Sequence, residues 1–210
     1  MRTIVIASQK GGVGKTTIAG HLAVMAESVG AGPVALIDTD PQGSLASWWN
    51  ERTEEAPLFA QVDIQNLPAR LVELGAAGIE LAIIDTPPAV TELISTVLKV
   101  ADLVVIPTRP SPHDLRAVGS TVELVERAGK RMVFVINGAA ARARITGQAA
   151  IALSQHGTVA PVTLHQRTDF ASSMIDGRTA QEIDVSGRSS SEIAELWKYV
   201  ATQLDKSVVA

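Results

Sequence analysis

Apolar and polar positions follow two alternating patterns along this chain. Short continuous apolar runs, which predict strands, lie at residues 3–7, 34–37, 81–84, 103–106 and 132–136. Between them, apolar residues recur at helical spacing in stretches at about 16–28, 44–52, 68–76, 90–100, 112–128 and 145–156. Continuous apolar runs are typical of strands buried on both faces, as in parallel sheets. The alternation therefore predicts an α/β fold in which a mostly parallel, doubly wound sheet carries helices on both faces.

A further helix is predicted at about residues 190–204. One stripe of this helix is apolar and holds Ile193, Leu196, Trp197, Val200 and Leu204, with Ser189, Ser190 or Ser191 as the expected N-cap. A helix that binds a membrane surface needs a cationic face. Here Lys198 and Lys206 are offset by three nearby acidic residues. We therefore expect this helix to pack against the core, and we expect no membrane partner.

Length and composition favour one globular domain spanning residues 1–210. The chain has 210 residues, of which 46% are hydrophobic and 3% aromatic. It has no Cys, which excludes disulfides, thiolate metal sites and a cysteine nucleophile, and with them an iron–sulfur carrier. We see no signal-peptide pattern at the N-terminus and no apolar run long enough to span a membrane. The expected location is therefore the cytoplasm.

Charge is unevenly distributed between the two parts of the chain. The overall net charge of −4 argues against a protein that is basic throughout. Residues 130–178, however, contain six Lys and Arg against two Asp, a net charge of +4, so the rest of the chain carries −8. A basic segment on an acidic body can still dock on a polyanion through one face.

The most specific motif follows the first predicted strand and opens the first helix. It reads Gln9-Lys10-Gly11-Gly12-Val13-Gly14-Lys15-Thr16-Thr17. Glycines let successive N–H groups point inward, and a helix N-terminus adds partial positive charge, so the segment suits a phosphate. Lys15 is placed to reach the β- and γ-phosphates, and the Thr16 hydroxyl to ligate Mg²⁺. Gln9 stands where the general P-loop pattern has Gly, and Lys10 is an extra lysine; the alternative is an ordinary turn with a solvated charge.

Acidic residues follow the next two strands, at the edge where open parallel sheets bind ligands. Asp38 and Asp40 come after the second strand. One carboxylate can hold a metal-bound water while the other orients the attacking water. The alternative is an Asp-Pro turn with helix capping. Asp85 follows the third strand, where a carboxylate can act through Mg²⁺ and its waters.

Three segments together resemble the nucleotide motifs of the ParA/MinD family of deviant Walker ATPases. They are the glycine loop from Lys10 to Thr16, Asp38-Thr39-Asp40-Pro41-Gln42, and Ile83-Ile84-Asp85-Thr86-Pro87-Pro88. Residues 107–114 are similar to the short partition ATPases that lack an N-terminal helix-turn-helix, and residues 166–170 and 176–177 resemble their C-terminal region. The resemblance implies a P-loop NTPase that uses ATP and Mg²⁺, and a homodimer that sandwiches the nucleotide.

The resemblance also implies roles for individual residues. Lys10 is expected to cross the dimer interface to the phosphates of the partner, and Asp40 to position the hydrolytic water. Lys15 is expected to bind phosphate. The implied nucleotide-binding set is Gly11, Gly12, Val13, Gly14, Lys15, Thr16 and Thr17, with Pro107 and Asn137 as adenine contacts, and the implied metal set is Thr16, Asp38 and Asp85.

ParA-like members bind non-specific DNA in their ATP state, and the basic segment fits this behaviour. The candidate contacts are Arg142, Arg144, Arg167 and Arg178, although solvated or paired arginines explain these positions equally well. The predicted function is slow, partner-stimulated ATP hydrolysis by a nucleoid-associated protein. It would segregate a plasmid or chromosome centromere complex, or position a protein assembly, together with a ParB-like or other adaptor. The alternative is a metabolic ATP-dependent ligase of the dethiobiotin-synthetase kind, which needs a polar pocket for a small substrate.

Overall fold

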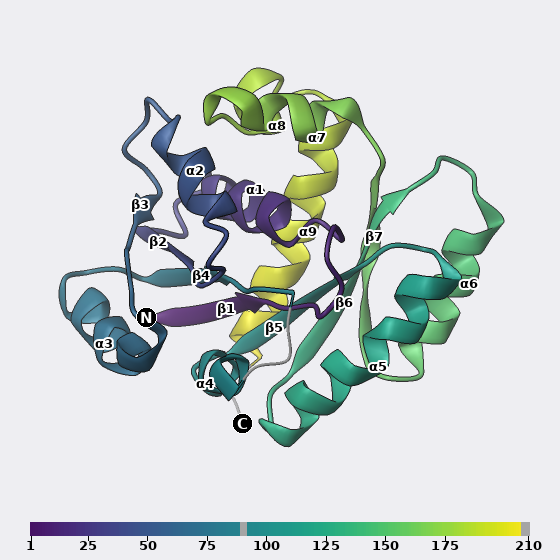
Figure 1. Ribbon diagram of the computed structural model, residues 1–210. Helices are drawn as coiled ribbons and strands as arrows, with labels where there is room; N and C mark the ends of the chain where they lie inside the picture. Colours follow the sequence, from purple (N-terminus) through teal and green to yellow (C-terminus); the bar gives the residue numbers. More distant parts are fainter. Residues whose placement is uncertain (89–91, 207–210) are drawn as a thin grey trace.

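The computed structural model describes residues 1–88 and 92–206. Over these residues, seven strands form one sheet in the order β3-β2-β4-β1-β5-β6-β7, and every recorded pair is parallel (Figure 1). The strands are β1 (Arg2–Ile6), β2 (Val34–Asp38), β3 (Leu58–Phe59), β4 (Leu81–Asp85), β5 (Leu103–Thr108), β6 (Met132–Ala139) and β7 (Thr158–His165). The prediction of a parallel α/β sheet is confirmed.

Helices cover both faces of the sheet (Figure 1). One face packs against α1 (Lys15–Ser28), α2 (Ser44–Asn50), α7 (Thr168–Ser172), α8 (Ala180–Ile183) and α9 (Arg188–Asp205). The other packs against α3 (Leu67–Ala76), α4 (Glu92–Lys99), α5 (Pro112–Arg127) and α6 (Arg144–Ser154). Short 3₁₀ turns lie at Ile64–Asn66 (η1) and Ser173–Asp176 (η2).

Successive residues of each central strand point into opposite cores. In β1, Ile4 and Ile6 pack on the face of the sheet that α1 covers, and Val5 packs on the face that α4 covers; all three are fully buried. In β4, Ile83 likewise faces α1 and Ile84 faces α4. Because both faces of these strands are buried, their central positions are apolar on both sides, which explains the continuous runs in the sequence.

The structure differs from the prediction near the C-terminal end. The last helix begins at Arg188 after Gly187 and has no side-chain cap, so the predicted serine N-cap is wrong. Instead the Ser189 hydroxyl donates to the Asp169 carboxylate at 2.7 Å, and the Ser190 hydroxyl donates to the Asp184 carbonyl at 2.5 Å. The five residues of the predicted apolar stripe are buried. In the part of the chain that the structure describes, no helix is long and apolar enough to cross a membrane.

The order of the strands gathers the candidate site at one edge of the sheet. β1 lies between β4 and β5, and β2 pairs with the far side of β4. The carboxyl ends of these strands therefore bring together the glycine loop after β1, Asp38 at the end of β2 and Asp85 at the end of β4. Asn137, near the end of β6, joins the same edge by contacting the glycine loop. This edge is where open parallel sheets hold their ligands.

Candidate nucleotide site

The glycine loop joins β1 to α1 in a conformation that needs glycine. Gly12 and Gly14 have φ angles of 74° and 92°, in the left-handed region that other residues rarely adopt. A Cβ on Gly14 would also lie 2.2 Å from Nδ2 of Asn137. Gly14 precedes the first residue of α1 and provides no side-chain cap. The helix N-terminus therefore opens onto the loop, which favours a bound anion.

Lys15, the first residue of α1, is buried beside the acidic residues of the site. It is 7% exposed. Burial lowers the pKa of Lys15, although the charges of Asp85 and Asp40 act in the opposite direction. A buried ammonium group is costly unless an anion accompanies it. Lys15 is therefore suited to a phosphate group that enters between the loop and these acids.

Thr16 and Asp85 form the contact that best fits a divalent cation. Thr16 Oγ1 lies 2.5 Å from Oδ2 of Asp85, which is 1% exposed. Burial raises the pKa of Asp85 to about 7 and the charge of Asp38 adds to this, while hydrogen bonding from Thr16 lowers it. A hydroxyl and a desolvated carboxylate are oxygen ligands of the kind that Mg²⁺ prefers, and Mg²⁺ commonly fills its other positions with phosphate and water. Thr16 and Asp85 are thus the residues that would hold Mg²⁺, directly or through water.

Asp38 makes hydrogen bonds that shape the turn after β2. Its Oδ1 accepts the N–H of Asp40 at 2.9 Å, and its Oδ2 accepts the N–H groups of Leu45 and Ala46 at 3.0 Å each. Both carboxylate oxygens therefore serve the turn and the N-terminus of α2, as the helix-capping alternative anticipated. Asp38 therefore fixes the loop that carries Asp40, and its predicted role at the metal stays a prediction.

Asp40 is half-buried and close enough to Lys15 to affect its pKa. Its Oδ1 accepts the N–H of Gln42 at 3.0 Å. Among the described residues, no partner of its other carboxylate oxygen is recorded. Asp40 is therefore available to orient a water molecule, and its predicted catalytic role stays a prediction.

Lys10 contrasts with Lys15. Lys10 is exposed, and its backbone N–H donates to the Ser8 hydroxyl at 3.3 Å. Within residues 1–88 and 92–206 its ammonium group makes no recorded salt bridge. The charge of Lys10 is therefore free to act on a group outside its own chain.

A cavity of about 530 Å³ adjoins the glycine loop. Its lining includes Gly14, Asn137 and Arg109, together with His165 at the end of β7 and the next two residues, Gln166 and Arg167. Asn137 Nδ2 donates to the carbonyl of Val13 at 2.6 Å, so the predicted adenine contact does lie beside the loop. The volume is usual for a small-molecule site.

Pro107 does not line this cavity. It is buried within β5, where it pairs in register with Val135. The predicted adenine contact of Pro107 therefore stays a prediction, whereas Arg109, two residues later, lines the cavity and packs over Gly138.

Glu192 of α9 holds one wall of the cavity. Its carboxylate accepts the backbone N–H of His165 at 2.9 Å and lies 2.8 Å from Nδ1 of the same ring. It also accepts Nη2 of Arg167 at 2.6 Å. Burial opposes ionisation of Glu192, but hydrogen bonds from Arg167 and His165 hold its pKa below the ordinary value. Arg167, predicted as a DNA contact, is thus an ion-paired residue of the cavity wall.

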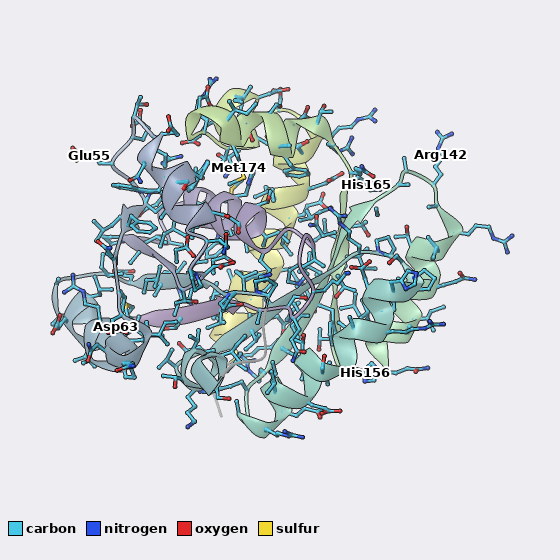
Figure 2. The ribbon with its side chains drawn as sticks, viewed as in Figure 1. Glu55, Asp63, Arg142, His156, His165 and Met174 are labelled. Carbon is cyan, nitrogen blue, oxygen red and sulfur yellow. The ribbon has the colours of Figure 1, made fainter. Side chains whose placement is uncertain are left out.

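The remaining DNA candidates lie on two separate segments. Arg142 and Arg144 are exposed at the junction of β6 and α6, and Arg142 points away from the body of the molecule (Figure 2). Arg178 is exposed on the segment before α8 and is ion-paired with Asp176 at 2.6 Å. Of the four candidates, Arg142 and Arg144 are therefore best placed to meet a polyanion.

A buried histidine ties α1 to α8. His21 Nδ1 lies 2.8 Å from the carbonyl oxygen of Thr17, and Nε2 accepts the N–H of Ala180 at 3.1 Å. These contacts suit the neutral tautomer with its proton on Nδ1. Burial lowers the pKa of His21 to about 4, although the Thr17 carbonyl and the charge of Glu182 act to raise it.

This histidine predicts a pH dependence of stability. Between pH 6.5 and about 4 the unfolded chain binds a proton on His21 and the folded chain does not, so stability falls as the pH falls. The contribution is roughly 3 kcal/mol over this interval. Urea unfolding across the pH series should show a smaller loss for His21→Gln than for the unmodified protein. Equal losses in the two proteins would contradict the assignment, since all other titrating groups are shared.

The fold and the site together define a P-loop nucleotide-binding protein. A model of the CobQ/CobB/MinD/ParA nucleotide binding domain matches residues 4–180, and the chain belongs to this family. It is an ATPase of the ParA/MinD type. The predicted resemblance is thus confirmed.

Individual relatives refine this placement. The chain is 28% identical to the maintenance of carboxysome distribution protein A of Halothiobacillus neapolitanus, over 90% of this chain and 91% of that protein. It is 43% identical to the protein of the same name from Gloeobacter kilaueensis, over 60% of this chain and 56% of that one. The structure of apo McdA from Cyanothece superposes with a TM-score of 0.80 at 19% identity, covering 97% of this chain and 99% of that one, which supports the fold.

Proposed function

We propose that this protein is an ATP-driven positioning protein that dimerises around ATP, binds non-specific DNA in that state and distributes a cargo. The observation that carries the proposal is the contrast within the glycine loop, where Lys15 is buried against the acids of its own chain and Lys10 is exposed. An exposed lysine beside a phosphate site is available to the nucleotide of a second subunit. Hydrolysis then depends on dimerisation.

Different residues have different roles in phosphoryl transfer, which requires positioning of the reacting groups and neutralisation of their charge. The N-terminus of α1 and Lys15 bind the phosphates. Thr16 and Asp85 hold Mg²⁺, which when bound offsets phosphate charge. Asp40 orients the attacking water, and Lys10 of the second subunit stabilises the charge that develops on the transferred group.

The names of the relatives support the proposed kinds of cargo. Two of them are named for the distribution of carboxysomes, so a protein assembly is one candidate cargo, beside a plasmid or chromosome centromere complex. We propose that the ATP-bound dimer resides on nucleoid DNA in the cytoplasm. A ParB-like or other adaptor on the cargo stimulates hydrolysis and releases the dimer.

A metabolic ligase of the same fold would differ from a positioning protein in what stimulates its ATP turnover. The positioning protein should hydrolyse ATP slowly alone and faster with DNA and its adaptor. A ligase should consume ATP only when a carboxylate or amine substrate is supplied. Steady-state ATPase assays with and without DNA distinguish the two.

DNA binding should depend on Arg142 and Arg144. The double variant Arg142→Ala/Arg144→Ala should cosediment less with non-specific DNA in ATP, because each substitution removes a cation that can neutralise a DNA phosphate. The slope of log affinity against log salt should become shallower by about 1 for each phosphate that is no longer neutralised. Arg127→Ala is the matched control, since Arg127 is an exposed arginine at the C-terminal end of α5, away from this segment, and is paired with Glu123 at 3.6 Å. Equal binding in ATP and ADP, or an unaltered salt slope in the double variant, would contradict the proposal.

A further inference from the structure

The segment 177–182, which we call the clasp, lies beside α1 and α2 on the face of the sheet opposite α4 (Figure 1). We infer that the clasp positions Asp40 for hydrolysis by holding α2 on α1, and that Arg52 and Glu182 are positioning residues for the ATPase reaction. The inference rests on the role proposed above for Asp40.

Arg52, just beyond α2, makes the main contact with the clasp. Its side chain is 2% exposed, and its two terminal nitrogens donate to the two carboxylate oxygens of Glu182 at 3.1 and 2.9 Å. The same nitrogens donate to the carbonyls of Gly177 at 2.7 Å and Ala56 at 2.8 Å. Only the planar fork of arginine can serve four acceptors in this way. The contact therefore specifies arginine, beyond a requirement for positive charge.

Backbone packing brings the clasp against the same region. Gly177 has a φ of 76°, and a Cβ at this position would lie 2.3 Å from the backbone nitrogen of Arg52. The indole N–H of Trp48, in α2, donates to the carbonyl of Arg178 at 3.0 Å. The ring of Trp48 also packs on Gly20 of α1, where a Cβ would lie 3.2 Å from it. The clasp, α2 and α1 thus meet with no room for additional side-chain atoms.

The middle of the clasp is fixed to α1. The N–H of Ala180 donates to His21 Nε2, and the Gln181 side-chain amide donates to the His21 carbonyl at 2.9 Å. His21 lies one helical turn after Thr17, which lines the cavity beside the glycine loop. The helix that begins at the phosphate loop is therefore the base on which the clasp holds α2.

The position of α2 determines the position of Asp40. Asp38 caps α2 through Leu45 and Ala46 and also accepts the N–H of Asp40. On the other side, Thr39 is anchored to the Asp85 carbonyl through its hydroxyl at 2.6 Å. Asp40 thus lies between Thr39, which is anchored to β4, and α2, which has only seven residues. A helix this short depends on tertiary contacts for its position, and the clasp supplies them.

Two substitutions separate this positioning role from a general loss of structure. Glu182→Gln keeps a side chain that can cap Thr179, whose N–H and hydroxyl donate to Glu182 at 2.8 Å, but removes the charge that Arg52 faces. Arg52→Lys keeps the positive charge but loses the planar guanidinium group that contacts both carboxylate oxygens of Glu182. The matched control is Asp176→Asn, which removes the exposed ion pair that Asp176, just before the clasp, makes with Arg178.

The experiment compares hydrolysis with nucleotide binding in the full chain. Under single-turnover conditions with Mg-ATP and DNA, both clasp variants should hydrolyse ATP about 10-fold more slowly or worse, because small misplacement of a catalytic group is costly. Their affinity for a fluorescent ATP analogue should change less than about 3-fold, and the control should match the unmodified protein. Thermal unfolding verifies that each variant is folded. If Arg52→Lys does not fold, the comparison is made with Glu182→Gln alone.

Unchanged hydrolysis in Glu182→Gln overturns the inference. An equal loss of hydrolysis and of nucleotide affinity also overturns it, because that result indicates a merely structural role. Asp40→Ala is the reference variant. If Asp40→Ala hydrolyses ATP normally, the proposed function of Asp40 is wrong, and so is the inference that the clasp positions it for hydrolysis. If Asp40→Ala is inactive, the clasp variants alone decide whether the clasp positions Asp40.

Discussion

Replacing Lys15 with alanine is expected to abolish ATP binding and every behaviour that depends on ATP. Lys15 is buried at the start of α1, and its pKa is lowered by burial despite the nearby acids. Without it, the phosphates would enter beside Asp85 and Asp40 with no buried cation to offset them. We expect affinity for a fluorescent ATP analogue to fall by roughly 100-fold or more, as for the loss of charge-assisted hydrogen bonds in a desolvated site.

The same burial predicts that Lys15→Ala folds normally. Burial lowers the pKa of Lys15 even though Asp85 and Asp40 are nearby, so desolvation outweighs the attraction of these acids, and removing the ammonium group should leave the unfolding temperature without nucleotide unchanged or raised. ATP should raise the unfolding temperature of the unmodified protein and not that of the variant. Lys198→Ala, an exposed lysine on α9, is the control that should keep the ATP response. An ATP-dependent rise in Lys15→Ala would show that the phosphate site lies elsewhere.

Hydrophobic patterning predicted the centre of the sheet because those strands are buried on both sides. It missed β7, an edge strand in which Pro161 and other exposed positions interrupt the apolar run. It also missed β3, which has two residues, and the short helices α7 and α8. Elements of this length have too few positions to display a period, and tertiary contacts such as His21 to Ala180 decide their conformation.

The phosphate-binding part of the site was predictable because it is local. The loop, its following helix and the acids at strand ends each lie within one short segment. The cavity wall is not local: Arg109 follows β5, Asn137 lies in β6 and His165 ends β7, so they meet only through the register of these three strands. The pairing of Arg167 with Glu192 spans 25 residues and leaves no sequence signal, which is why Arg167 resembled a free cation.

Replacing Lys10 with alanine is expected to leave ATP binding intact and to remove hydrolysis. Lys10 is exposed and its ammonium makes no recorded contact with the described part of its own chain, so the nucleotide site of the monomer should be unaffected. A cation supplied to phosphoryl transfer by a second subunit contributes roughly 10³-fold or more to the rate. Single-turnover hydrolysis should fall by this order while affinity for the ATP analogue is retained. Normal hydrolysis in Lys10→Ala would contradict the role of the extra lysine.

Mixing two inactive variants tests whether Lys10 acts across the interface. In a dimer of Lys10→Ala with Asp40→Ala, the nucleotide site of the Lys10→Ala subunit keeps its own Asp40 and receives Lys10 from the other subunit. That site should be active, whereas the second site lacks both groups. Equal mixing should therefore restore about a quarter of the unmodified activity, because about half of the dimers are mixed and each has one complete site. If Lys10 served its own chain, the mixture would stay inactive, since no site would then combine Lys10 with Asp40.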